Sequence, residues 1–191
     1  MNETYKVQVQ GLVDDLKAVF THAGLGGEAG EYKLLTQSFL YKFLNDKFLY
    51  QAKVLDESNT YENLLTMSEE DYDWLLEDIG TSTAWLKPDQ LIETLHRQQN
   101  EATFYETFEN TLNQIAIDNN DIFSVHTDGD TAIRLFDERL ITDTISDSSK
   151  RNEVAKAIIN LLARVKFDEA IFSQGFDFFS TLFEYMIKDY N

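Results

Sequence analysis

The stretch that decides the fold is residues 31–56, which read EYKLLTQSFLYKFLNDKFLYQAKVLD. Apolar side chains recur along it every three or four residues, the spacing that places them on one face of an α-helix. These side chains are Leu34, Leu35, Phe39, Leu40, Phe43, Leu44, Phe48, Leu49 and Ala52. Because the apolar face is broad, we expect a long helix from Glu31 to Asp56 at the centre of the core.

The same pattern extends outward over most of the 191 residues, which include one proline and eight glycines to interrupt helices. Ser68 and Thr103 each begin a capping box, completed by Asp71 and Glu106 three residues later. We predict further helices over Glu3–His22, from Ser68, over Asp89–Gln98 behind Pro88, from Thr103, and over Lys150–Val165, with a short turn over Phe167–Phe172. The expected fold is mainly α, a multi-helix orthogonal bundle.

Residues 122–136 are ambiguous. They fit a short β-hairpin around the Asp128-Gly129 turn, or a loop followed by a short helix from Asp130. Two domain organisations remain open as well. The chain is either a single helical domain over 1–191, or a small subdomain over 1–120 followed by 121–191.

Composition excludes several classes of protein. Hydrophobic residues make up 43% of the chain, too many for a disordered protein, yet no apolar run approaches the ~20 residues of a membrane span. The N-terminus lacks the features of a signal peptide. Cysteine is absent, which excludes disulfides and thiolate metal sites and fits a reducing compartment. We therefore expect a cytoplasmic protein with no membrane partner.

The net charge of −18 argues against a free-standing nucleic-acid binder, since cations supply most of the affinity for phosphate. The charge is unevenly distributed. Nine carboxylates and no lysine or arginine lie between Asp56 and Trp85, while 33–53 and 150–166 are locally basic. These basic segments are either solvated helix faces or cationic patches able to face phosphate. The candidate phosphate contacts are Lys33, Lys42, Lys47, Lys150, Arg151, Lys156 and Arg164.

No catalytic centre is visible in the residues alone. The glycine-rich segment Gly24–Gly30 follows a predicted helix, whereas a dinucleotide-binding loop follows a strand, so we interpret it as a helix–helix connection. Glu93 and His96 form a single Glu-x-x-His pair, although di-iron bundles need two such pairs. Asp118 and Asp121 do not fit a calcium loop. We predict no catalytic, cofactor-binding or metal-ligating residue.

The chain ends on an aromatic segment, Phe176–Tyr190, whose apolar residues again have helical spacing. Domains seldom finish on such a helix, because termini usually lie loose at the surface. We therefore expect that this chain is the front of a longer protein.

Two segments resemble the modification subunits of type I restriction–modification DNA methyltransferases. Tyr32–Asp46, with its Phe39-Leu-Tyr-Lys42 core, is similar to the early helix of that family's all-helical N-terminal domain. Phe176–Tyr190 is similar to the helix with a Tyr-Glu-Tyr-Leu-Ile-like core that directly precedes the catalytic domain. Phe183 stands where tyrosine is common in the family, and Met186 where leucine is common.

The resemblance implies that this chain is the N-terminal domain of such a subunit, assisting assembly and DNA clamping. The parent would transfer a methyl group from S-adenosylmethionine to adenine N6 in specific DNA. Its catalytic domain is expected beyond residue 191, because a chain with one proline cannot hold the family's Pro-Pro motif. No catalytic or cofactor residue is carried over. The implied partners are a specificity subunit, a second modification subunit, a restriction subunit, and DNA in the assembled complex.

Two other functions stay open. The main alternative is a non-catalytic acidic adaptor or DNA mimic, in which the carboxylates from Asp56 to Asp78 occupy a basic partner surface. The other is a hydrolase that uses paired carboxylates, for which the spacing selects no pair.

Overall fold

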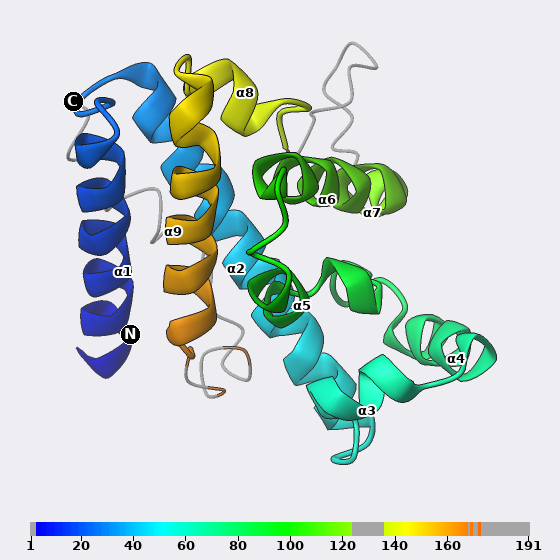
Figure 1. Cartoon of the computed structure of the whole chain (residues 1–191). Coiled ribbons are helices and arrows are strands. Elements are labelled where there is room, and N and C mark those ends of the chain that lie inside the picture. The colour runs from blue at the N-terminus through cyan, green and yellow to red at the C-terminus, as the bar shows by residue number, and fades with distance from the viewer. Residues whose placement is uncertain (1–2, 124–135, 168, 170–171, 173–191) are drawn as a thin grey trace, which may run out of the picture.

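The computed structural model describes residues 3–123, 136–167, 169 and 172. This part of the chain is mainly helical and forms a bundle, as the sequence predicts (Figure 1). Its α-helices are α1 (Glu3–His22), α2 (Ala29–Leu55), α3 (Tyr61–Thr66), α4 (Glu69–Ile79), α5 (Ile92–Arg97), α6 (Phe104–Asp118), α7 (Asn120–Phe123), α8 (Leu140–Thr144) and α9 (Arg151–Arg164). Short 3-10 helices cover Pro88–Gln90 and Ser148–Lys150.

Helix α2 lies at the centre of the bundle. It packs against α1, α4, α8 and α9, and Figure 1 shows it passing diagonally behind α9. Its buried apolar side chains surround the helix rather than following one stripe, as expected for a helix covered from several sides. They include Leu34, Leu35, Phe39, Tyr41, Phe43, Leu44, Phe48 and Ala52. The predicted central helix is confirmed, with ends that differ from the prediction by one or two residues.

Helix α9 is the second main scaffold. It packs against α1, α5 and α6, and it runs beside α1 in the opposite direction (Figure 1). One hydrophobic core extends from Val9 in α1 to Phe167 beyond α9, and it includes Phe108 of α6 and Ile158 of α9. The described residues before and after position 120 therefore share a single core.

Of the two predicted capping boxes, one cap is present and the other is wrong. The backbone N–H of Asp71 donates to Ser68 Oγ at 3.1 Å, which caps α4 as expected. The Thr103 side chain makes no capping hydrogen bond at the start of α6. Instead, Asn152 of α9 accepts from the backbone N–H of Tyr105 at 3.0 Å. A residue from another helix thus supplies a side-chain acceptor at the start of α6, and it binds the N–H of Tyr105 rather than the N–H of Glu106 that the capping box would use.

This difference gives a direct test by paired substitutions. Ser68→Ala is expected to lower the free energy of unfolding by about 1 kcal/mol, because it removes an N-cap acceptor from α4. Thr103→Ala, at an exposed position without a capping bond, should change it by less than about 0.5 kcal/mol. Urea denaturation followed by circular dichroism measures both changes. Equal losses in the two variants would contradict this assignment of the caps.

The remaining segment predictions have different outcomes. The predicted connection from α1 to α2 is present over residues 23–28, with Ala29 and Gly30 already in α2, and Gly24 and Gly27 adopt positive φ angles of 89° and 77° in this turn. Pro88 opens a short 3-10 helix, and α5 begins separately at Ile92. At the proposed hairpin, Ile122 and Phe123 lie in α7, while 124–135 lie outside the described residues. The final helix predicted from Phe176 to Tyr190 also lies outside them.

None of the helices in the described part of the chain is both long enough and apolar enough to cross a lipid bilayer.

Candidate functional site

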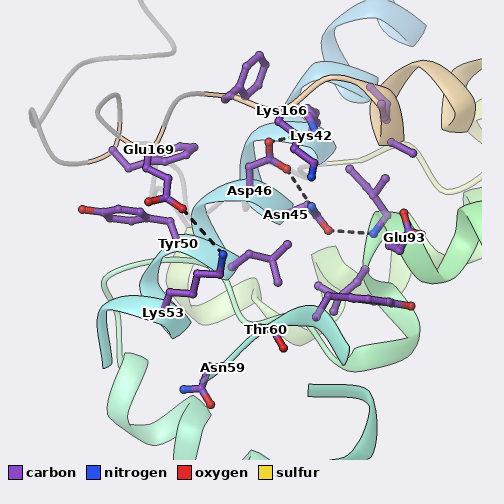
Figure 2. Close-up of a pocket in the computed structure, with 18 of the residues that line it drawn as sticks. Lys42, Asn45, Asp46, Tyr50, Lys53, Asn59, Thr60, Glu93, Lys166 and Glu169 are labelled. Carbon is purple, nitrogen blue, oxygen red and sulfur yellow. Dashed lines mark hydrogen bonds and ion pairs between the residues drawn. The ribbon is translucent and has the colours of Figure 1, made fainter. Parts of the chain in front are cut away.

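A cavity of about 510 Å³ opens beside the C-terminal half of α2. Its walls come from α2, the start of α3, α5, the end of α9 and described residues that follow α9 (Figure 2). Its polar and charged lining includes Lys42, Asn45, Asp46, Lys53, Tyr61, Glu62, Glu93, Arg97, Lys166 and Glu169. The cavity is the meeting point of segments that are far apart in the sequence.

Three polar residues of α2 form one wall of the cavity, and we call Lys42, Asn45 and Asp46 the α2 polar cluster. Positions three and four residues apart lie on the same side of a helix, so the sequence itself brings them together. Lys42 Nζ lies 3.0 Å from Asp46 Oδ2, and Asn45 Nδ2 donates to Asp46 Oδ1 at 3.0 Å. Figure 2 shows the three side chains joined by these contacts.

The cluster also binds two other segments through backbone groups. Asn45 Oδ1 accepts from the backbone N–H of Ile92, the first residue of α5, at 2.9 Å. The Lys42 ammonium donates to the backbone carbonyl of Val165, directly after α9. Both backbone groups lie at a helix end, where the helix itself offers them no hydrogen-bond partner. The α2 polar cluster therefore fixes α5 and the exit from α9 to the central helix.

Burial dominates the electrostatics of this pair. Lys42 is only 3% exposed, and burial lowers its pKa, although the neighbouring Asp46 carboxylate acts in the opposite direction. Lys166 contributes a further, smaller lowering because it is a like charge. Burial also raises the pKa of Asp46, against the stabilising effect of Lys42 on the carboxylate. For both groups the cost of leaving water exceeds the benefit of pairing.

The charged side chains at the cavity rim are engaged with one another. Arg97 lies 2.5 Å from Glu62 and 3.4 Å from Glu93, and its guanidinium stacks over the Tyr61 ring at 4.9 Å. Lys53 lies 4.0 Å from Glu169. Exposed ion pairs of this kind contribute little to stability. At the rim, cations and carboxylates face each other, which gives the cavity no excess charge that would select a ligand.

The chemistry available in the α2 polar cluster is structural rather than catalytic. The Lys42 ammonium binds the Asp46 carboxylate and the backbone carbonyl of Val165. The Asp46 carboxylate also accepts from the Asn45 amide. Glu93 contacts Arg97, its partner one helical turn away. Among the described residues, no three or more His, Cys, Asp or Glu side chains come together in a group able to hold a metal ion.

One of the predicted phosphate contacts is wrong. Lys42 is buried and bound to Asp46 and Val165, so in this fold its ammonium cannot reach a phosphate. The sequence pattern missed this because α2 is covered on several sides. A lysine beside the apolar residues of such a helix lies in the interior.

The other six candidates stay predictions, and the structure disperses them. Lys33 is exposed and pairs with Asp137 at 3.4 Å, while half-buried Lys47 lies over the Phe43 ring and burial lowers its pKa. Arg151 donates to the carbonyl of Ile145 at 2.8 Å. The remaining candidates are Lys150, Lys156 and Arg164.

The basic residues of α9 do not line up into one stripe. Arg151 and Arg164 are separated by about 20 Å along the axis of an α-helix. Arg151, Lys156 and Arg164 also point in different directions, because successive residues rotate by about 100°. Arg164 lies 4.0 Å from Asp15 of α1. These three side chains therefore do not form a single phosphate-binding groove along α9.

The sequence did not single out Asn45 and Asp46 as members of a site. Their signal was available in the Lys-x-x-Asn-Asp spacing, which places an ammonium, an amide and a carboxylate within one turn. That signal has no meaning until the burial of this side of α2 is known.

No protein-family model, curated protein or solved structure matches this chain.

Proposed function

We propose that this chain is the helical N-terminal domain of a type I restriction–modification modification subunit. The parent protein transfers a methyl group from S-adenosylmethionine to adenine N6 in specific DNA, in the cytoplasm. The domain assists assembly with the specificity subunit, the second modification subunit and the restriction subunit, and it helps to hold DNA. It contributes no catalytic or cofactor-binding residue of its own.

The α2 polar cluster is the observation that carries this proposal. The segment that resembles the family, Tyr32–Asp46, lies within α2 and ends in the cluster. Through Lys42, the cluster holds the chain at Val165, where it leaves α9 toward the second resembling segment. A domain that must orient a following catalytic domain needs its exit point held firmly. In this proposal the α2 polar cluster is thus a structural anchor, and the shared hydrophobic core of the surrounding helical bundle supports that role.

The reading frame beyond codon 191 tests the proposal. It is expected to encode a glycine-rich cofactor loop and an Asn-Pro-Pro-Phe-like motif. The full-length product should bind S-adenosylmethionine in calorimetry and, with its specificity subunit, methylate adenine in DNA. The 191-residue chain alone should bind no S-adenosylmethionine. A stop codon directly after Asn191, in a gene with no DNA-modifying neighbours, would contradict the proposal.

The DNA mimic is the second candidate, and a separate observation favours it. All nine carboxylates between Asp56 and Asp78 are exposed. Such a surface can occupy a basic groove that normally receives DNA. A mimic is expected to bind no DNA even at low salt and to compete with DNA for a basic partner. Electrophoretic mobility shifts of labelled duplex DNA, with and without that partner, distinguish it from a DNA-clamping domain.

A further inference from the structure

Helix α4 presents an exposed tryptophan on an otherwise acidic face. Trp74 is 61% exposed, whereas Tyr72, Leu75, Leu76 and Ile79 turn the opposite side of the helix into the core. A large indole left in water is unusual, because burying an aromatic side chain is strongly favourable. The position is therefore a candidate contact with another molecule.

Four carboxylates surround Trp74 on the helix surface. Residues three and four positions away on a helix are its neighbours, and at Trp74 these are Glu70, Asp71, Glu77 and Asp78. All four are exposed. We call these five residues the Trp74 face. It combines an aromatic surface with four negative charges and includes no positive one.

Other exposed apolar side chains gather at the same end of the molecule. Of the six large exposed apolar residues in the described part of the chain, four lie between 54 and 74, namely Val54, Leu55, Leu65 and Trp74. Figure 1 shows the end of α2, α3 and α4 together at one end of the bundle. Exposed apolar residues grouped in this way are typical of protein-interaction surfaces.

We propose that the Trp74 face binds an arginine- and lysine-bearing surface of a partner protein. The carboxylates attract the cations, and the indole offers its ring to a guanidinium or ammonium group, the strongest such contact among the aromatic residues. Tryptophan is also among the residues that dominate binding energy at interfaces. Nucleic acid is disfavoured as the occupant because its phosphates would face four like charges. The inference does not depend on the proposed methyltransferase role.

The backbone beneath the Trp74 face is fixed, which lowers the entropic cost of binding. Ser68 caps the start of α4. The Tyr72 hydroxyl donates to the backbone carbonyl of Leu86, and Trp85 Nε1 donates to the carbonyl of Gly80 at 2.7 Å. Both ends of α4 are thus tied to the segment that follows the helix, and the face is presented in one orientation.

The two tryptophans of the chain, Trp74 and Trp85, allow a specific readout. We expect octa-arginine peptide, titrated at low salt into the ¹⁵N-labelled protein, to shift the Trp74 indole signal and leave that of Trp85 nearly unchanged. Trp74→Ala should weaken binding about tenfold, as measured by calorimetry, and Trp74→Phe less. Neither substitution removes a core contact, because the side chain is mostly in water.

Matched charge variants separate this surface from general attraction to an acidic protein. Glu77→Gln/Asp78→Asn should weaken octa-arginine binding more than fivefold without loss of stability, because both carboxylates lie unfavourably at the negative end of the α4 dipole. The control, Asp143→Asn/Glu153→Gln, removes two exposed charges elsewhere and should change affinity by less than about twofold.

Three results would overturn the proposal. The first is an unshifted Trp74 signal at millimolar octa-arginine. The second is equal weakening by the two charge variants. The third is a shift of the Trp74 indole by duplex DNA at low salt, which would assign the face to nucleic acid instead. Octa-glutamate peptide should shift neither indole signal.

Discussion

Replacing Lys42 with methionine is expected to lower the free energy of unfolding by about 3–5 kcal/mol, the usual cost of breaking a buried ion pair. Methionine keeps most of the apolar stem of Lys42 but leaves the Asp46 carboxylate without its cation. It also removes the donor to the carbonyl of Val165. Urea denaturation monitored by circular dichroism measures the loss.

Two control variants show whether pairing is the cause. Lys33 lies on the same helix as Lys42 but forms an exposed ion pair with Asp137. Lys33→Met should therefore cost less than about 1 kcal/mol. Lys42→Met/Asp46→Leu removes both buried charges and should recover most of the loss, since an apolar pair often replaces a buried ion pair at little cost. If the double variant is no more stable than Lys42→Met, the ion-pair explanation is wrong.

The stability deficit of Lys42→Met is also expected to depend on pH. Burial already raises the pKa of Asp46 above its ordinary 3.8, and without Lys42 the opposing cation is lost, so the pKa rises further. A carboxyl group with a raised pKa favours the folded state below its unfolded pKa, and this contribution disappears as the pH rises through the folded pKa.

The deficit relative to wild type should therefore grow between about pH 4 and about pH 7. Urea midpoints at the two pH values measure it. In Lys42→Met/Asp46→Asn the titrating group is gone, so this growth should be absent. A deficit in Lys42→Met that shrinks with rising pH would contradict the role assigned to Asp46.

Glu109→Ala is the second substitution with a large expected effect, a loss of about 2–4 kcal/mol. Glu109 of α6 is 5% exposed and accepts from the backbone N–H groups of Ile141 and Thr142, both at 3.0 Å, and from the Thr142 hydroxyl at 2.7 Å. The two N–H groups belong to the first turn of α8, which has no side-chain cap at Arg139. Alanine leaves buried donors without an acceptor, and that desolvation penalty is the cause of the loss.

Graded variants and amide exchange test this explanation. Glu109→Gln keeps an acceptor oxygen without the charge and should lose about half as much as Glu109→Ala. Glu106→Ala, at an exposed position on α6, should lose less than about 0.5 kcal/mol. Hydrogen exchange of the Ile141 and Thr142 amides should accelerate in Glu109→Ala more than exchange in α2. Unchanged protection of these two amides would contradict the capping role.

The helices themselves could be predicted from the sequence because their signals are local. The spacing of apolar residues from Leu34 to Ala52 indicated the central helix, and α1 has the predicted ends Glu3 and His22. The Ser68 cap and the Gly24–Gly30 connection also followed from neighbouring residues. Each of these features depends on backbone geometry and periodicity within a few turns.

The roles of charged residues could not be predicted in the same way. Lys42 and Lys33 lie on the same helix and look alike in the sequence, yet one is buried and the other is exposed. The Thr103 pattern predicted a local cap for α6, whereas the side-chain acceptor at that helix end is Asn152 of another helix. Glu109 carried no sequence signal of its partners, which lie more than 30 positions away.

By itself, then, the sequence determined a mainly helical chain, the position of its central helix and the acidic character of 56–85. Only the tertiary structure decided which polar groups leave water. The reason is physical: helix formation is governed by contacts between residues three and four apart, but the desolvation of Lys42, Asp46 and Glu109 depends on helices that meet across the core. The same packing left Trp74 outside the core and turned its four acidic neighbours toward solvent.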